Sequence, residues 1–204
     1  MKNLLIAVSA LCLMLASCSK DDDELVFQIL DDTRPVPSKY DKVSATEFKN
    51  LFFGYGWKEA ETHEINIDGT INKEDYWEDM VGGGPHIYEF TDTVIIDYFY
   101  ADAIPANVSV PYKYTYDETT NSVCYNYETT NSVYYTNGGN FWFCIVCASS
   151  TEVTIIKRAG WKANRDSNQL RPVYHYVTLK RLTAAELEQV RNSYTPFDLV
   201  ERYH

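Results

Sequence analysis

Two cysteines near the middle of the chain have a spacing that can bind a metal ion or exchange a disulfide. Cys144 and Cys147 form a C-x-x-C motif within NFWFCIVCASS, residues 140–150. Aromatic and aliphatic residues dominate this segment, which is typical of a strand, and residues three apart in a regular strand point to opposite faces. The motif therefore predicts two structural thiols, and neither a zinc site nor a redox pair.

A further cysteine, Cys124, leaves the disulfide state of this region open. Pairing with Cys144 or Cys147 is one alternative. Against it, the sequence predicts a short strand at 132–136 between Cys124 and Cys144. In an antiparallel meander that strand would hold the two thiols about two strand spacings apart, which is too far for a disulfide.

Tyrosines recur at every second position of VSVPYKYTYD, residues 108–117, and place Tyr112, Tyr114 and Tyr116 on one face of a predicted strand. Such a stripe could line a barrel cavity and offer flat apolar rings with polar tips to a sugar, a lipid or an aromatic ligand. It could equally be core packing. The three tyrosines are therefore candidate ligand contacts, with a structural role as the alternative.

A second candidate contact surface is the polar segment 157–171, which the sequence predicts to be a long loop. Trp161 lies there beside Lys162, Arg165 and Arg171, and an aromatic residue among cations is common on recognition surfaces. Loops of this length in compact domains tend to be functional. We expect Trp161 and Arg165 to contact a ligand.

Motifs of catalysis and cofactor binding are absent from the sequence. It contains no G-x-S-x-G, no H-E-x-x-H and no Walker loop. The four histidines, His63, His86, His175 and His204, lie far apart without the spacing of metal ligands. We therefore expect a protein that is not an enzyme, with no catalytic residues, no metal and no cofactor.

The N-terminal residues 1–17 have the pattern of a secretion signal: Lys2 is followed by an apolar run that is too short to remain as a transmembrane helix. The run ends in Leu-Ala-Ser-Cys18, which resembles the lipobox of bacterial lipoproteins. The resemblance implies cleavage before Cys18 and acylation of that residue. Several acyl chains on one residue would anchor the protein stably to a membrane.

The residues after Cys18, Ser-Lys-Asp-Asp-Asp-Glu at 19–24, resemble the acidic sorting signal of Bacteroidota surface lipoproteins. This resemblance implies an outer-membrane protein, lipid-anchored and facing the cell exterior; a solvated acidic tether is the alternative. We assign residues 18–43 to a flexible linker. In the same phylum, Asp-Thr93-Val resembles the acceptor of protein O-glycosylation, on Thr93.

Helix and strand signals place these candidates in one domain, residues 44–204. Ser44 with Glu47 and Thr183 with Glu186 form capping boxes, which begin a short helix and a helix ending near Ser193. Between them, short turns separate eight to nine strand-like segments. The sequence predicts a mainly β domain: an antiparallel up-and-down meander or barrel of about eight strands, with an N-terminal and a C-terminal helix.

The charge of the chain limits its partners. The formal net charge is −11, which argues against nucleic acid as a partner, although residues 151–204 carry nine basic and six acidic side chains. The excess of basic side chains in residues 151–204 indicates a modestly basic surface in that part of the protein.

The order of helix, strands and helix, together with Gly56-Trp57, resembles the lipocalin-like or calycin group over about residues 45–195. That family has Gly-x-Trp on its first strand, whereas this chain has Gly54-Tyr-Gly-Trp57. The resemblance, closest to small Bacteroidota lipoproteins of largely unassigned function, implies a closed barrel with a ligand cavity.

We expect a surface lipoprotein that binds a small apolar or saccharide ligand without catalysis. The alternative is a structural or interaction module of an outer-membrane complex, whose interior would be packed solid.

Overall fold

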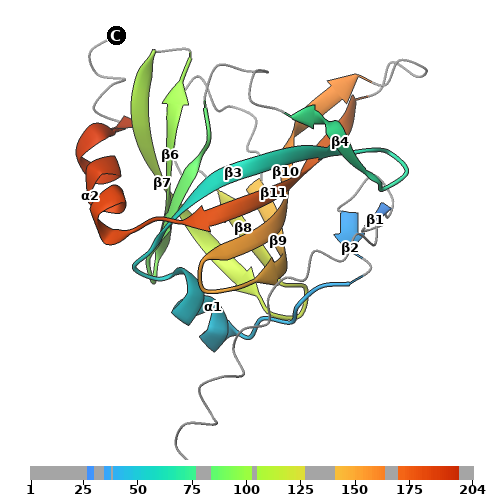
Figure 1. Ribbon diagram of the computed structural model, residues 1–204, viewed down its shortest axis with the longest axis horizontal. Coiled ribbons are helices and arrows are strands. Elements are labelled where there is room, and N and C mark those ends of the chain that lie inside the picture. The colour runs from blue at the N-terminus through green and yellow to red at the C-terminus, as the bar shows by residue number, and fades with distance from the viewer. Residues whose placement is uncertain are drawn as a thin grey trace, which may run out of the picture.

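The computed structural model describes residues 27–29, 35–37, 39–76, 84–102, 105–126, 141–163 and 170–197. They form a mainly β protein built around a closed barrel of eight antiparallel strands, with a helix near each end of the chain (Figure 1). The predicted fold class is confirmed. No helix among these residues is long and apolar enough to cross a membrane.

The barrel strands are β3 (Gly56–Ile65), β5 (Ile87–Phe90), β6 (Val94–Ala101), β7 (Ala106–Asp117), β8 (Ser122–Asn126), β9 (Phe141–Ala148), β10 (Glu152–Ala163) and β11 (Leu170–Arg181). The other elements are β1 (Phe27–Ile29), β2 (Pro35–Pro37), α1 (Ala45–Phe52), β4 (Ile71–Tyr76), α2 (Ala184–Ser193) and β12 (Thr195–Pro196).

The barrel closes between its first and last strands. From β5 to β11 each strand pairs with the next one along the chain, and β11 then pairs with β3, from His175 opposite Glu64 to Arg181 opposite Trp57. Strands β5 and β4 share the other edge of β3. They pair with its first half and its second half respectively.

Helix α1 covers one end of the barrel (Figure 1). Both hydrogen bonds of the predicted capping box at Ser44 are present, and Phe48 and Phe52 are fully buried. The ring of Phe48 stacks on Tyr116 at 4.1 Å, and that of Phe52 lies 4.6 Å from Phe90. This end is therefore filled by aromatic side chains.

Helix α2 packs on the outer face of the barrel, beside β6 and β7 (Figure 1). It begins at the predicted capping box and ends at Ser193, as expected. The helix approaches Gly56 so closely that a Cβ atom there would lie 2.8 Å from Leu187 Cδ1. A glycine at this position thus allows the helix to lie against β3.

Strand β9 is apolar on both faces, as its sequence indicates. Phe143 and Ile145 belong to the core inside the barrel, while Trp142 and Cys144 belong to a second buried cluster on its outer face. The strand is covered on both sides, which explains why its sequence lacks the usual polar alternation.

The predicted opposite orientation of Cys144 and Cys147 is wrong. Cys144 lies opposite Ile156 and Cys147 opposite Thr154, so a β-bulge leaves Val146 as one extra residue of β9. Because Thr154 and Ile156 are two apart on β10, both cysteines lie on the outer face. The alternation rule fails here because it assumes a regular strand.

The prediction that a strand separates Cys124 from Cys144 is also wrong. Strand β8 pairs directly with β9, with Cys124 opposite Trp142 and Ser122 opposite Cys144. The two cysteines therefore lie diagonally on neighbouring strands, and Cys124, Cys144 and Cys147 are all free thiols. Residues 132–136 lie outside the described part of the chain.

The N-terminal linker joins the domain earlier than the sequence indicates. Val43 is buried, and its backbone N–H donates to Asn121 Oδ1 at 3.1 Å. The N–H of Asp41 donates to the carbonyl of Val146 on β9 at 2.7 Å. The last residues assigned to the flexible linker are therefore fixed on the barrel.

The predicted long loop at 157–171 is mostly strand. Strand β10 continues to Ala163 and β11 begins at Leu170, and they pair along this length apart from a bulge near Gly160. The sequence of this stretch lacks the alternation of apolar and polar residues that is typical of a strand, and pairing between β10 and β11 forms the strands nonetheless.

Candidate functional site

The three predicted tyrosine contacts all lie on the inner face of the barrel, in β7. Tyr112 is buried with its ring 5.4 Å from that of Tyr125. The hydroxyls of Tyr114 and Tyr116 donate to the backbone carbonyls of Thr91 and Val43, each at 2.8 Å. The contacts of Tyr114 and Tyr116 belong to the end covered by α1, and ligand binding by the stripe stays a prediction.

The other predicted residues are not brought together with the stripe. Trp161 is part of β10, but its side chain is outside the described residues, as are Arg165 and the proposed lipidation site Cys18. Thr93 is exposed in the turn between β5 and β6, where its N–H donates to Thr91 Oγ1 at 3.3 Å. Its modification stays a prediction.

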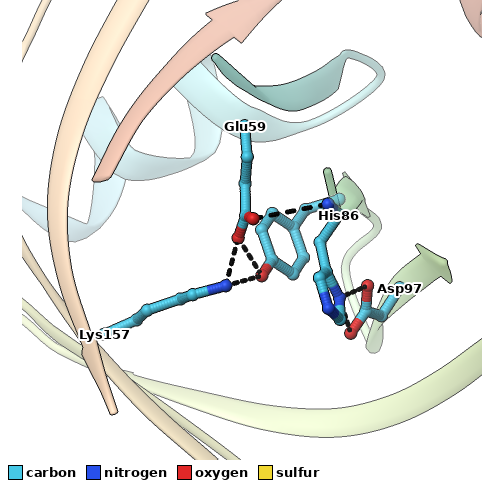
Figure 2. Close-up of polar contacts among 5 residues, drawn as sticks. Glu59, His86, Asp97 and Lys157 are labelled. Atoms are coloured by element: carbon cyan, nitrogen blue, oxygen red, sulfur yellow. Dashed lines mark hydrogen bonds and ion pairs between the residues drawn. The ribbon is translucent and has the colours of Figure 1, made fainter. Parts of the chain in front are cut away.

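A group of charged side chains occupies the barrel interior beyond the aromatic end. Trp57 contacts Phe52 of α1 at 5.4 Å between rings, and the next inward side chain of β3 is Glu59. Lys157 of β10 reaches Glu59 past β11, the strand that lies between β10 and β3 (Figure 2). Tyr88 of β5 joins them, since it lies opposite Trp57 and shares its face.

Glu59 accepts hydrogen bonds at both carboxylate oxygens. Its Oε1 accepts from the Tyr88 hydroxyl at 2.8 Å and from the Lys157 ammonium, and its Oε2 accepts from the backbone N–H of His86 at 3.3 Å. Glu59 is 8% exposed, and Lys157 16%. We call Glu59, Tyr88 and Lys157 the inner triad.

His86 and Asp97 form a second polar pair next to the inner triad (Figure 2). His86 Nδ1 lies 2.9 and 3.1 Å from the two oxygens of Asp97, which is on β6 opposite Tyr88. The imidazole also stacks on Phe99 at 5.2 Å. Its side chain is 34% exposed, against 8% for Asp97, so solvent reaches the group at His86.

The partners fix the charge of these groups. Burial acts to raise the pKa of Glu59, but the nearby positive charges of Lys157 and His86 outweigh it and lower the pKa. Burial likewise opposes protonation of His86, and the Asp97 carboxylate outweighs it, so the pKa of His86 is raised. Burial and the Glu59 charge raise the pKa of Tyr88, which keeps its hydroxyl a donor.

A closely similar set of groups lies on the outer face beneath α2. Glu89 of β5 accepts from the Tyr98 hydroxyl at 2.8 Å and from Arg191 of α2, whose Nε lies 3.2 Å from Glu89 Oε2. We call Glu89, Tyr98 and Arg191 the outer triad. It joins the helix to the barrel, whereas the inner triad joins no helix.

The interior group offers hydrogen-bond donors, acceptors and two charges of each sign within a protein interior. Such a group can orient a ligand that carries hydroxyl or amide groups. Within the described residues, no three metal-ligating side chains come close enough to hold an ion.

Sequence reasoning missed this group because its members come from separate parts of the chain. One signal was present: Asp97 interrupts the apolar run VIIDYFYA, and Lys157 ends the run EVTIIK. A charge at an inward position of an apolar strand is costly, so it marks a candidate site.

No protein-family model matches the sequence, and no curated protein matches it.

Proposed function

We propose that this protein binds a small polar ligand inside the barrel, with saccharides as the leading class, and that it does so without catalysis. One observation supports the proposal most: the charged side chains of Glu59 and Asp97, both buried, and of half-buried Lys157 lie inside the barrel, where apolar residues would also fill the space. Ligand contact would explain why they are polar.

The energetics favour a functional reason for the inner triad. Removing two opposite charges from water costs several kcal/mol per ion, and their attraction often does no more than offset that cost. The outer triad has a structural reason, because Arg191 belongs to α2. The inner triad connects strands that the barrel already holds through backbone hydrogen bonds.

The groups near the solvent favour a hydroxylated ligand over an apolar one. His86 is the most exposed member, and it stacks on Phe99 while Asp97 fixes its ring. A sugar can place a C–H face on such rings and its hydroxyls on the neighbouring polar groups. An apolar ligand could not form hydrogen bonds with these polar groups.

A thermal-shift screen with mono- and oligosaccharides, amino acids and fatty acids tests this proposal. A ligand at 100 times its Kd stabilises by about 2.7 kcal/mol, which raises Tm measurably. We expect a saccharide to stabilise the wild type, and Glu59→Gln to lose that stabilisation. Glu89→Gln is the matched control and should keep it.

Two outcomes would contradict the proposal. The first is that no saccharide or other polar compound stabilises the wild type, which would favour the interaction-module alternative. The second is that Glu59→Gln and Glu89→Gln respond equally to the ligand. The double variant Glu59→Gln/Lys157→Met, which leaves no unpaired charge, guards against a variant that fails to fold.

We also propose that the barrel is anchored at the outer membrane through acylated Cys18 and faces the cell exterior. The lipobox and the acidic run after it support this. Radioactive fatty acid should label the wild type and Cys124→Ser, and not Cys18→Ser. Retained label on Cys18→Ser would contradict the anchor, and resistance to protease added to intact cells would contradict exposure.

A further inference from the structure

A hollow of about 410 Å³ lies on the outer face of the barrel, behind the polar interior group. Its lining alternates along the strands with inward residues already described: Lys58 precedes Glu59, Ile87 lies between His86 and Tyr88, and Tyr100 follows Phe99. The lining also includes Pro85, Asn107 and Tyr194. We call this feature the outer hollow.

One wall of the outer hollow is held in place by the outer triad. Tyr194 follows α2 directly, and its ring packs edge to face on Tyr98 at 5.5 Å and 80°. Tyr98 in turn donates to Glu89, which Arg191 holds. The Tyr194 ring is therefore positioned before any ligand arrives, which lowers the entropy cost of binding.

The other aromatic ring of the outer hollow is open to solvent. Tyr100 is 37% exposed and is one of three large apolar side chains exposed among the described residues. It lies opposite Asn107 in the pairing of β6 with β7, so both side chains share the outer face.

The polar groups of the outer hollow can hydrogen-bond a ligand, although the Lys58 ammonium also acts on the nearby Glu186 carboxylate, whose pKa is lowered by hydrogen bonds from Thr183 and further by this charge. Among the described residues, neither the Lys58 ammonium nor the Asn107 amide has a side-chain hydrogen bond, and no carboxylate is part of the lining. The hollow thus combines two tyrosine rings with an ammonium and an amide.

We propose that the outer hollow is a saccharide-binding site, distinct from the interior one and large enough for one or two sugar rings. Tyrosine rings pack against the C–H faces of a sugar, while Lys58 and Asn107 hydrogen-bond its hydroxyl or carboxylate groups. Lipid ligands need nearly complete burial, which a surface hollow does not give. Lys58 repels cations.

Binding of cellohexaose, maltohexaose and a heparin hexasaccharide to the full-length protein, measured by calorimetry, tests the site. We expect at least one of them to bind, Tyr100→Ala to raise its Kd at least tenfold, and Lys58→Ala to raise it a few-fold. Tyr100→Phe keeps the ring and should bind nearly as the wild type does. A preference for heparin would identify Lys58 as a carboxylate or sulfate contact.

Tyr40→Ala is the matched control, since Tyr40 is exposed to a similar degree, 43%, at a distant position. Glu59→Gln separates the two sites: it removes interior binding and leaves the outer hollow intact. The inference is overturned if none of the three oligosaccharides binds, or if Tyr100→Ala binds as tightly as Tyr40→Ala. Neither result bears on the interior site, which the thermal-shift screen tests separately.

Discussion

The inner and outer triads contain the same chemistry on opposite faces of one sheet. Each has a glutamate that is 8% exposed at its side chain, a tyrosine hydroxyl at 2.8 Å and a cationic partner. The two triads differ in the secondary-structure element that supplies the cation. Lys157 is 16% exposed and comes from β10, which β11 separates from β3, whereas Arg191 is 45% exposed and comes from α2.

That difference shows how to separate a structural ion pair from a candidate binding group. The outer triad connects two elements that would otherwise be held mainly by apolar contacts such as Leu187 on Gly56. The inner triad joins β3, β5 and β10, strands that backbone hydrogen bonds already hold in one barrel. Two triads with the same contacts can therefore have different roles, one structural and one in ligand binding. The secondary-structure elements that a triad joins indicate which role it has.

Replacing the cations should separate the triads most strongly. Lys157→Met removes the ion-pair partner of the buried Glu59 carboxylate and should lower the free energy of unfolding by about 3 kcal/mol or more. Arg191→Met removes a half-exposed partner and should cost about 1 kcal/mol. Urea unfolding at pH 7 measures both. Equal losses would show that the two pairs contribute alike, and the comparison would fail.

Replacing the tyrosines should show where the triads are equivalent. Tyr88→Phe and Tyr98→Phe each delete one hydrogen bond to a charged carboxylate, and each should lower the free energy of unfolding by about 1.5 kcal/mol. The two bonds have the same length. Urea unfolding measures the losses; a gap of more than about 1 kcal/mol would mean that burial or neighbours outweigh the bond itself.

The smallest effect should be a pH dependence confined to the inner side. Because Asp97 raises the pKa of His86 above 6.5, protonated His86 stabilises the fold fully below pH 6.5, and this contribution is lost as the pH rises through the folded-state pKa. The stability difference between wild type and His86→Gln should therefore shrink from pH 6 to pH 8. A difference that is constant or grows would contradict the His86–Asp97 pair.

Local signals predicted most of the fold. Both capping boxes, the inward face of β7 and the two apolar faces of β9 depend on residues close in sequence, and all are present. The loop predicted at 157–171 and the predicted separation of Cys124 from Cys144 by one strand were wrong, because strand length and strand neighbours depend on pairing between distant segments.

Local signals could mark Asp97 and Lys157 as unusual charges, but they could not group the residues of the candidate site, for the same reason. Glu59 and Lys157 are 98 residues apart in sequence, and each resembles a solvent-facing residue of an amphipathic strand. Only closure of the barrel brings them face to face. By contrast, the sequence did predict the tyrosine stripe, because Tyr112, Tyr114 and Tyr116 recur at every second position of a single strand.

The bulge at Val146 has a consequence for insertions and deletions. Deleting Val146 would restore regular pairing, with Ile145 and Ala148 still opposite Ile155 and Val153. Deleting Phe143 instead would shift the register and turn the neighbouring side chains to the wrong face. Val146 is thus a site within a barrel strand where the length of the chain could change by one residue without a change in topology, although the N–H of Asp41 would lose the carbonyl to which it donates.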